Sequence, residues 1–233
     1  GESDAWVDDA LKSAQNKNMK VINLLDVLGN SVKEEEQVEG MQAEEEEEEG
    51  EEEGPEYDEH VWLSLKNAKT LCSSIADALC EIDSKNADVY KKNLNEYTKN
   101  LDALDKEYQQ AVNGAKYDTL VFGDRFPFRY MVDDYSLKYY AAFVGCSAET
   151  QASFETIKFL ANKVDELGVT TVLTIENPKH KIAQTVVENT KEKNQKILAL
   201  NSMQSVTSDD VKNGETYLNV MQSNLDVLKQ ALN

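Results

Sequence analysis

His60 is the residue of this sequence whose type and surroundings best suit metal binding. Tyr57 and two acidic residues precede it, Trp62 follows it, and a helical pattern starts shortly afterwards. A neutral imidazole at the entrance of a helix is a common ligand of divalent metals. A single histidine is more often a cap or a core residue, so His60 alone does not define a site. The other histidine, His180, lies between two lysines, and we expect it to be solvated.

A run of glutamates directly before His60 offers a second way to attract cations. Residues 33–59 contain 16 acidic side chains and one lysine, a net charge of −15 out of −20 for the chain. Carboxylates are hard oxygen ligands, but nothing in this run fixes their geometry. The run therefore either binds Zn²⁺, Mn²⁺ or Ca²⁺ loosely or is only a solvated loop. Having almost no aliphatic residues, it cannot bury enough surface to offset chain entropy. We predict a mobile acidic loop, and we expect that deleting Glu34 to Glu56 costs little stability.

Composition and motifs exclude several classes of protein. Outside the acidic loop the net charge is only −5 and no stripe of Lys or Arg is present, so nucleic acid is not an expected partner. Three cysteines without paired spacing are interpreted as structural thiols. No apolar run reaches about 18 residues, the length that spans a membrane. Nucleophile elbows, phosphate loops and His-Glu-x-x-His motifs are absent from the sequence, so we do not expect an enzyme.

The first half of the chain carries the elements that must position His60. Apolar spacing predicts a helix over 5–11, and the run Val21–Leu25 predicts a buried strand. Two further helices are predicted over 64–81 and 87–111. The second of these would be about 40 Å long, which is enough to connect two domains.

From Thr119 onwards, strand and helix patterns alternate. The predicted elements are strands at 119–122, 139–144, 171–175 and 197–200, with helices at 126–135, 153–167, 181–193 and 215–232. Such alternation predicts an α/β fold in which residues 119–233 form a complete four-stranded parallel sheet flanked by helices. The amino-terminal part, with one predicted strand, should form an incomplete lobe.

Polar residues gather after the predicted strands, at the edge where ligands bind in such sheets. These residues are Gly123-Asp124-Arg125, Gly145-Cys146, Glu176-Asn177 and Asn201-Ser202. We therefore expect a ligand site at the carboxyl ends of the strands.

Several motifs, in order, make the chain similar to one known family. Residues 58–68 read Asp-Glu-His-Val-Trp-Leu-Ser-Leu-Lys-Asn-Ala and resemble the Asp-x-His-x-Trp-Leu-x-Pro-x-x-Ala motif of the cluster 9 metal-binding proteins of ABC importers. The opening residues resemble that family's third-strand-to-helix turn, and residues 214–224 resemble its closing Gly-x-x-Tyr-x-x-x-Met-x-x-Asn pattern. The resemblance implies two lobes joined by a long backbone helix. The implied parts are a partial metal-binding lobe over 1–85 with the acidic loop at 33–59, a bridging helix over 86–114 and an α/β lobe over 115–233.

The metal ligands implied by this resemblance are only partly present. His60 keeps the family's histidine, although Leu65 replaces the proline of its motif. Arg125 stands where the family has a ligating His or Glu, and a guanidinium has no lone pair for a metal. Asn201 stands where the family has a ligating aspartate. The family's first histidine would lie upstream of Gly1, so we expect the chain to begin inside a domain.

Three arrangements of the altered site remain open from sequence. Asp124 and Glu176 are candidate oxygen ligands for a metal held by His60. Alternatively, Arg125 and Glu176 form an ion pair across the strand ends. In a third arrangement, Arg125 makes the pocket suitable for an anion or a metal chelate.

The resemblance implies a receptor that captures zinc, or less readily manganese, and delivers it to an ABC permease in the membrane. Such a receptor is extracytoplasmic, and its full-length form is anchored by a lipid. The alternative is a divergent relative that has lost tight metal binding and serves as a surface adhesion or interaction module.

Overall fold

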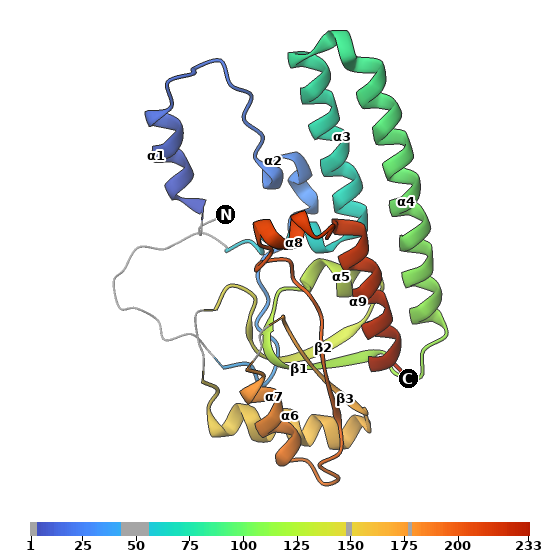
Figure 1. Cartoon of the computed structure of the whole chain (residues 1–233). Coiled ribbons are helices and arrows are strands. Elements are labelled where there is room, and N and C mark those ends of the chain that lie inside the picture. Colours follow the sequence, from blue (N-terminus) through green and yellow to red (C-terminus); the bar gives the residue numbers. More distant parts are fainter. Residues whose placement is uncertain (1–3, 43–55, 148–150, 177–178) are drawn as a thin grey trace.

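The computed structural model describes residues 4–42, 56–147, 151–176 and 179–233. Its carboxy-terminal half holds a four-stranded sheet with the order β2-β1-β3-β4 (Figure 1). All neighbouring strands are parallel, as predicted. The strands are β1 (Thr119–Phe126), β2 (Lys138–Val144), β3 (Thr171–Thr174) and β4 (Lys196–Ala199).

Helices cover both faces of the sheet because alternate strand residues point to opposite sides. On one face Val121 and Val172 pack against α6 (Phe154–Leu167) and α7 (Lys181–Glu188). On the other face Phe122 and Leu173 pack against α4 (Ala87–Asn113) and α9 (Tyr217–Ala231). Figure 1 shows α6 and α7 on the opposite side of the sheet from α4 and α9. The predicted α/β architecture is therefore confirmed.

The long predicted helix is present as α4, which has 27 residues. It packs beside α3 (Leu65–Ile82) as an antiparallel pair joined by the short helix η4 (Ser84–Asn86), and this hairpin extends beyond the sheet (Figure 1). The lower part of α3 shares one core with the sheet, since Leu65 and Ala68 belong to the same cluster as Phe122. The division of the chain into an amino-terminal lobe, a bridging helix and an α/β lobe, with boundaries at 85/86 and 114/115, stays a prediction. No described helix combines the length and apolar character needed to cross a membrane.

The described amino-terminal residues 4–42 form helices and no sheet. They contain α1 (Trp6–Ser13), α2 (Leu24–Leu28) and the short helix η2 (Gly29–Ser31). The strand predicted at Val21–Leu25 is wrong. The Asn23 side chain accepts hydrogen bonds from the backbone N–H groups of Leu25 and Asp26 at 3.0 and 3.4 Å, and so caps α2 in the middle of the apolar run.

The elements of the second half also differ from the predictions in several places. Strand β1 runs on to Phe126 because Pro127 keeps the preceding residue extended, so α5 begins only at the next turn (Arg129–Asp134). Helix α7 ends at Glu188, earlier than predicted. A short helix that was not predicted, α8 (Ser208–Lys212), follows β4, and a capping box between Thr207 and Asp210 starts it.

The two arms of the acidic loop are ordered, which corrects the prediction that the whole segment 33–59 is unstructured. Glu34 and Tyr57 form an antiparallel bridge, and the backbone N–H of Asp58 donates to the carbonyl of Lys33 at 2.9 Å. The first arm then follows the outer edge of β2, where the N–H of Gln42 donates to the carbonyl of Ala142 at 3.0 Å. The glutamate run over 43–55 lies outside the described residues.

Candidate metal site

His60 is buried at the carboxyl edge of the sheet, directly before the short helix η3 (Val61–Leu63). The residue is 1% exposed, and its ring lies against Gly145, the first residue after β2. A Cβ at Gly145 would lie 2.9 Å from the His60 ring, so a glycine is needed there. The indole of Trp62 lies next to the imidazole, with 5.4 Å between the ring centroids.

Both ring nitrogens of His60 have partners. The carboxylate of Asp58 lies 3.1 Å from Nδ1 and also accepts the backbone N–H of His60 at 2.8 Å. The side-chain amide of Gln204 contacts Nε2. The arrangement fits a neutral ring that donates from Nδ1 to Asp58 and accepts at Nε2 from Gln204. Metal-binding histidines use the same pattern, with one nitrogen oriented by a carboxylate and the other facing the metal. In this structure the nitrogen that would face a metal is contacted by Gln204.

Gln204 was not predicted as a site residue. It lies three residues beyond Asn201 in the turn after β4. The only features of the sequence that could have identified it as a site residue are its polar side chain and its position shortly after β4. An amide is an uncommon metal ligand, so sequence reasoning passed over it. The structure thus brings a turn 144 residues away onto His60.

Glu176 and Asn201, two predicted site residues, hold this turn in place. The Glu176 carboxylate accepts from the backbone N–H and the hydroxyl of Ser202 at 2.7 and 2.8 Å. The Asn201 side chain accepts the N–H of Met203 at 2.7 Å, and the Trp62 indole donates to the Ser202 carbonyl at 2.9 Å. Their role as ligands stays a prediction.

Asp124 and Arg125 lie at the end of β1. The Asp124 carboxylate accepts the backbone N–H groups of Arg125 at 2.9 Å and of Ile175 at 3.4 Å, and burial raises its pKa. The Arg125 guanidinium donates to the carbonyl of Ser147 at 3.1 Å. Among the residues that the structure describes, Arg125 and Glu176 form no ion pair, so that alternative is not realised.

The thiol of Cys146, beside Gly145, has a raised pKa although the residue is exposed. The causes are partial desolvation of the thiol and the nearby carboxylates of Glu35 and Glu59. Within residues 4–42, 56–147, 151–176 and 179–233, no group of three or more His, Cys, Asp or Glu side chains is placed to hold a metal. The described site therefore offers one imidazole, its orienting carboxylate and one amide.

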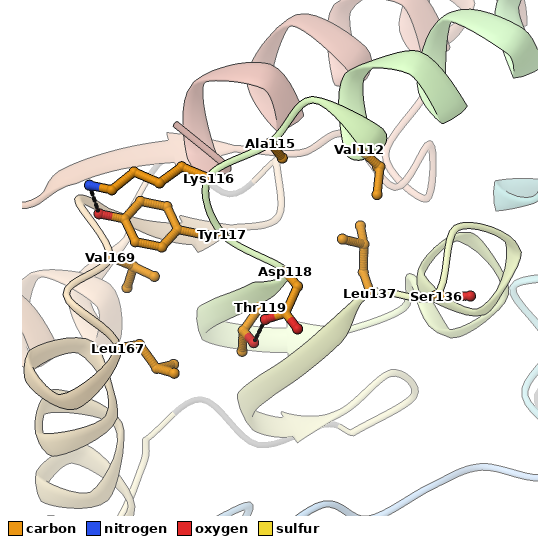
Figure 2. Close-up of a pocket in the computed structure, with 10 residues that line it drawn as sticks. All are labelled: Val112, Ala115, Lys116, Tyr117, Asp118, Thr119, Ser136, Leu137, Leu167 and Val169. Atoms are coloured by element: carbon orange, nitrogen blue, oxygen red, sulfur yellow. Dashed lines mark hydrogen bonds between the residues drawn. The ribbon is translucent and has the colours of Figure 1, made fainter.

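A cavity of about 450 Å³ lies at the opposite edge of the sheet. Thr119, Leu137 and Val169, which line it, lie at the amino ends of β1, β2 and β3. Figure 2 shows two hydrogen-bonded pairs of polar side chains in its lining, Lys116 with Tyr117 and Thr119 with Asp118. Because no histidine lines this cavity, the candidate site is the edge that carries His60.

Nearly the whole chain is similar to known proteins. The sequence matches the family described as zinc-uptake complex component A, periplasmic, over residues 1–231. It is 32% identical over 228 residues to the zinc-binding lipoprotein AdcA of Streptococcus pneumoniae, a match that covers 97% of this chain and 43% of the relative. The chain thus spans less than half the length of that protein.

Solved structures share the fold, and two of them serve as examples. One is the Zn(II)-bound ZnuA-like domain of Streptococcus pneumoniae AdcA, with a TM-score of 0.70, 28% identity and coverage of 99% of this chain and 77% of that chain. The other is the laminin-binding protein Lbp of Streptococcus pyogenes, with a TM-score of 0.64, 27% identity and coverage of 76% and 65%. The family match over nearly every residue, together with these structures, means that the chain belongs to the zinc-uptake component A family of metal-binding proteins, as its motifs indicated.

Proposed function

We propose that this chain is the metal-binding part of an extracytoplasmic zinc receptor, which passes its cargo to the permease of an ABC importer. The observation that carries this proposal is the Asp58–His60 pair, in which Nδ1 is held by a carboxylate and Nε2 faces the turn after β4. Family membership adds the chemical class of the cargo. The family is described as a zinc-uptake component, which is not an enzyme, and we infer the same of this protein.

Zinc reaches His60 only if Gln204 gives up its contact with Nε2. Turning the side-chain amide would present its oxygen, which is a weak, uncharged ligand, beside the imidazole. Arg125 adds no ligand and places a positive charge at the same edge of the sheet. We therefore infer an affinity well below that of a four-ligand site. Imidazole suits zinc better than manganese, which prefers oxygen ligands, so manganese is the weaker cargo.

A second function is favoured by the contact between Gln204 and His60 itself. Both ring nitrogens are satisfied within the protein, so the folded chain needs no metal to complete this site. A relative of the same fold is described as a laminin-binding protein. The alternative is thus a surface adhesion or interaction module that has lost tight metal binding.

The place of the protein in the cell belongs to the same proposal. A relative that matches 97% of this chain is described as a lipoprotein. We infer that the full-length protein lies outside the cytoplasm and is held at the membrane by a lipid.

Calorimetric titration with Zn²⁺ and Mn²⁺ tests the two functions. The receptor predicts one saturable zinc site per chain and weaker binding of manganese. A matched variant in which the glutamates of residues 43–55 are replaced by glutamine separates this site from loose binding by the acidic run. The site should survive in that variant. Absence of saturable zinc binding in the parent chain would instead support the adhesion or interaction module.

A further inference from the structure

The base of the acidic loop is tied to α5 by a buried tyrosine. The Tyr130 hydroxyl accepts the backbone N–H of Lys33 at 3.1 Å and donates to the carbonyl of Asp58 at 2.8 Å. The Tyr130 side chain is 2% exposed, and Val61, Leu71 and Leu28 pack in the same cluster. One hydroxyl group thus bonds both arms of the loop, and one of the two bonded residues orients His60.

A set of charged side chains holds the first arm in the same place. The Arg129 guanidinium lies 3.2 Å from the carboxylate of Glu36 and 2.9 Å from that of Asp133. Tyr139 donates to Glu36 at 3.1 Å, and Lys33 forms an ion pair with Asp133. Glu36, although it belongs to the glutamate-rich segment, is therefore an anchor of the arm.

The contact of Tyr130 matters because Asp58 has two tasks. Its backbone carbonyl receives the tyrosine hydroxyl, while its carboxylate accepts from both the N–H and the ring of His60. Asp58 is 2% exposed, so water is excluded from the pair. Groups that fix the ligand-orienting carboxylate in this way set ligand geometry in metal sites.

We propose that Tyr130 is a positioning residue for the metal site: its hydroxyl clasps the two arms of the acidic loop and thereby holds Asp58 where its carboxylate orients the His60 ring. The consequence for metal affinity rests on the proposed zinc-binding function. The consequence for the orientation and protection of His60 does not rest on zinc binding, and it can be measured without metal.

The test compares Tyr130→Phe with Tyr108→Phe in the full chain. Tyr108 is a matched control because it is also buried and donates its hydroxyl to a backbone carbonyl, that of Met221 at 2.7 Å, away from the loop. Modification of histidines by diethyl pyrocarbonate, followed by mass spectrometry without metal, reports access to His60, with His180 as internal reference. Loss of the Tyr130 hydroxyl should speed modification of His60 about tenfold, the effect of one buried hydrogen bond. Tyr108→Phe should leave that rate unchanged even if it lowers the melting temperature as much.

Zinc affinity gives the second readout. Tyr130→Phe should weaken binding about tenfold, as outer-shell changes do, and Tyr108→Phe should not weaken it. If the parent chain binds no zinc, the proposed function fails, while the modification rates still decide the role of Tyr130. Unchanged protection of His60 in Tyr130→Phe, or equal loss in Tyr108→Phe, overturns the inference.

Hydrogen exchange in the unmodified protein tests the same idea without a variant that must fold. The N–H of Lys33 is bonded to Tyr130 and the N–H of His60 to Asp58. If the clasp holds the pair, both amides exchange through the same opening, with protection that agrees within about threefold. A His60 amide that stays protected while that of Lys33 exchanges freely overturns the inference.

Discussion

The sheet-bearing region 119–233 and the amino-terminal residues 4–32 differ sharply in how they are held. In the first, helices cover both faces of the sheet, and Phe122, Phe143 and Leu173 are at most 1% exposed. In the second, α1 has no buried residue, Trp6 is 67% exposed, and Leu28 is the one residue of the described range that is buried. Stability therefore resides in the sheet and the helices packed on it. The candidate metal site borders this stable region, because His60 lies against Gly145 after β2 and against Gln204 after β4.

The strongest test of this contrast is a pair of aromatic truncations. Phe122→Ala removes a fully buried ring that packs against Phe126 and Phe128, and should lower the free energy of unfolding by about 3–5 kcal/mol. Trp6→Ala should change it by less than about 0.5 kcal/mol because the indole is exposed. Urea denaturation measures both. Comparable losses from the two changes would mean that the amino-terminal residues are bound far more tightly than the structure indicates.

The next test asks whether the site depends on the imidazole near the sheet. His60→Ala should reduce zinc affinity by at least about 100-fold, because oxygen ligands alone hold zinc poorly. His180→Ala, the matched control, should change affinity little. Competition with a chelating dye measures both affinities. If zinc binding is tight and does not change in His60→Ala, the zinc site lies on the glutamate run and not at His60.

A smaller gain is expected from restoring charged ligands. Gln204→Glu places a carboxylate at Nε2 of His60 and should raise zinc affinity about tenfold, with a further rise on adding Arg125→His. Asn201→Asp, which sequence alone would suggest, should give less, because that side chain already accepts the N–H of Met203. The same competition assay ranks the three variants. A larger gain from Asn201→Asp than from Gln204→Glu would contradict the assignment of the turn.

The smallest effect concerns the acidic loop. Deleting residues 43–55 removes nine glutamates and leaves both anchored arms, so the free energy of unfolding should change by less than about 0.5 kcal/mol, or rise as repulsion falls. Deleting 34–56 should cost more, because Glu36 and the bridge between Glu34 and Tyr57 are lost. Thermal unfolding of the two deletions gives the comparison. Equal stability in both would show that the arms contribute nothing.

The sheet was predictable because each of its strands carries an apolar run followed by a helical pattern. The amino-terminal helix α2 was not, since five apolar or neutral residues at Val21–Leu25 fit a strand as well as a helix start. The side chain of Asn23 decided between them by capping α2. The capping-box residues Thr207 and Asp210 were readable in the sequence and would have predicted α8.

The site was predictable only in part. His60 lies on a motif, and the structure places it at the predicted edge of the sheet. The partners of a buried ring depend on how distant turns pack, which local patterns do not encode. Glu176 and Asn201 marked the correct turn, but the residue that reaches the imidazole is Gln204.

The positions of His60 and Gln204 along the chain also determine the order in which the parts of the site are synthesised. The two residues are 144 positions apart, and Trp62 and Ser202, which are bonded beside them, are 140 apart. At ordinary translation rates the imidazole is made on the order of ten seconds before the amide that will face it. Contacts between residues so far apart in the sequence form late in folding. Until then Nε2 of His60 lacks the partner that Gln204 provides, so the contacts of the imidazole are complete only in the finished chain.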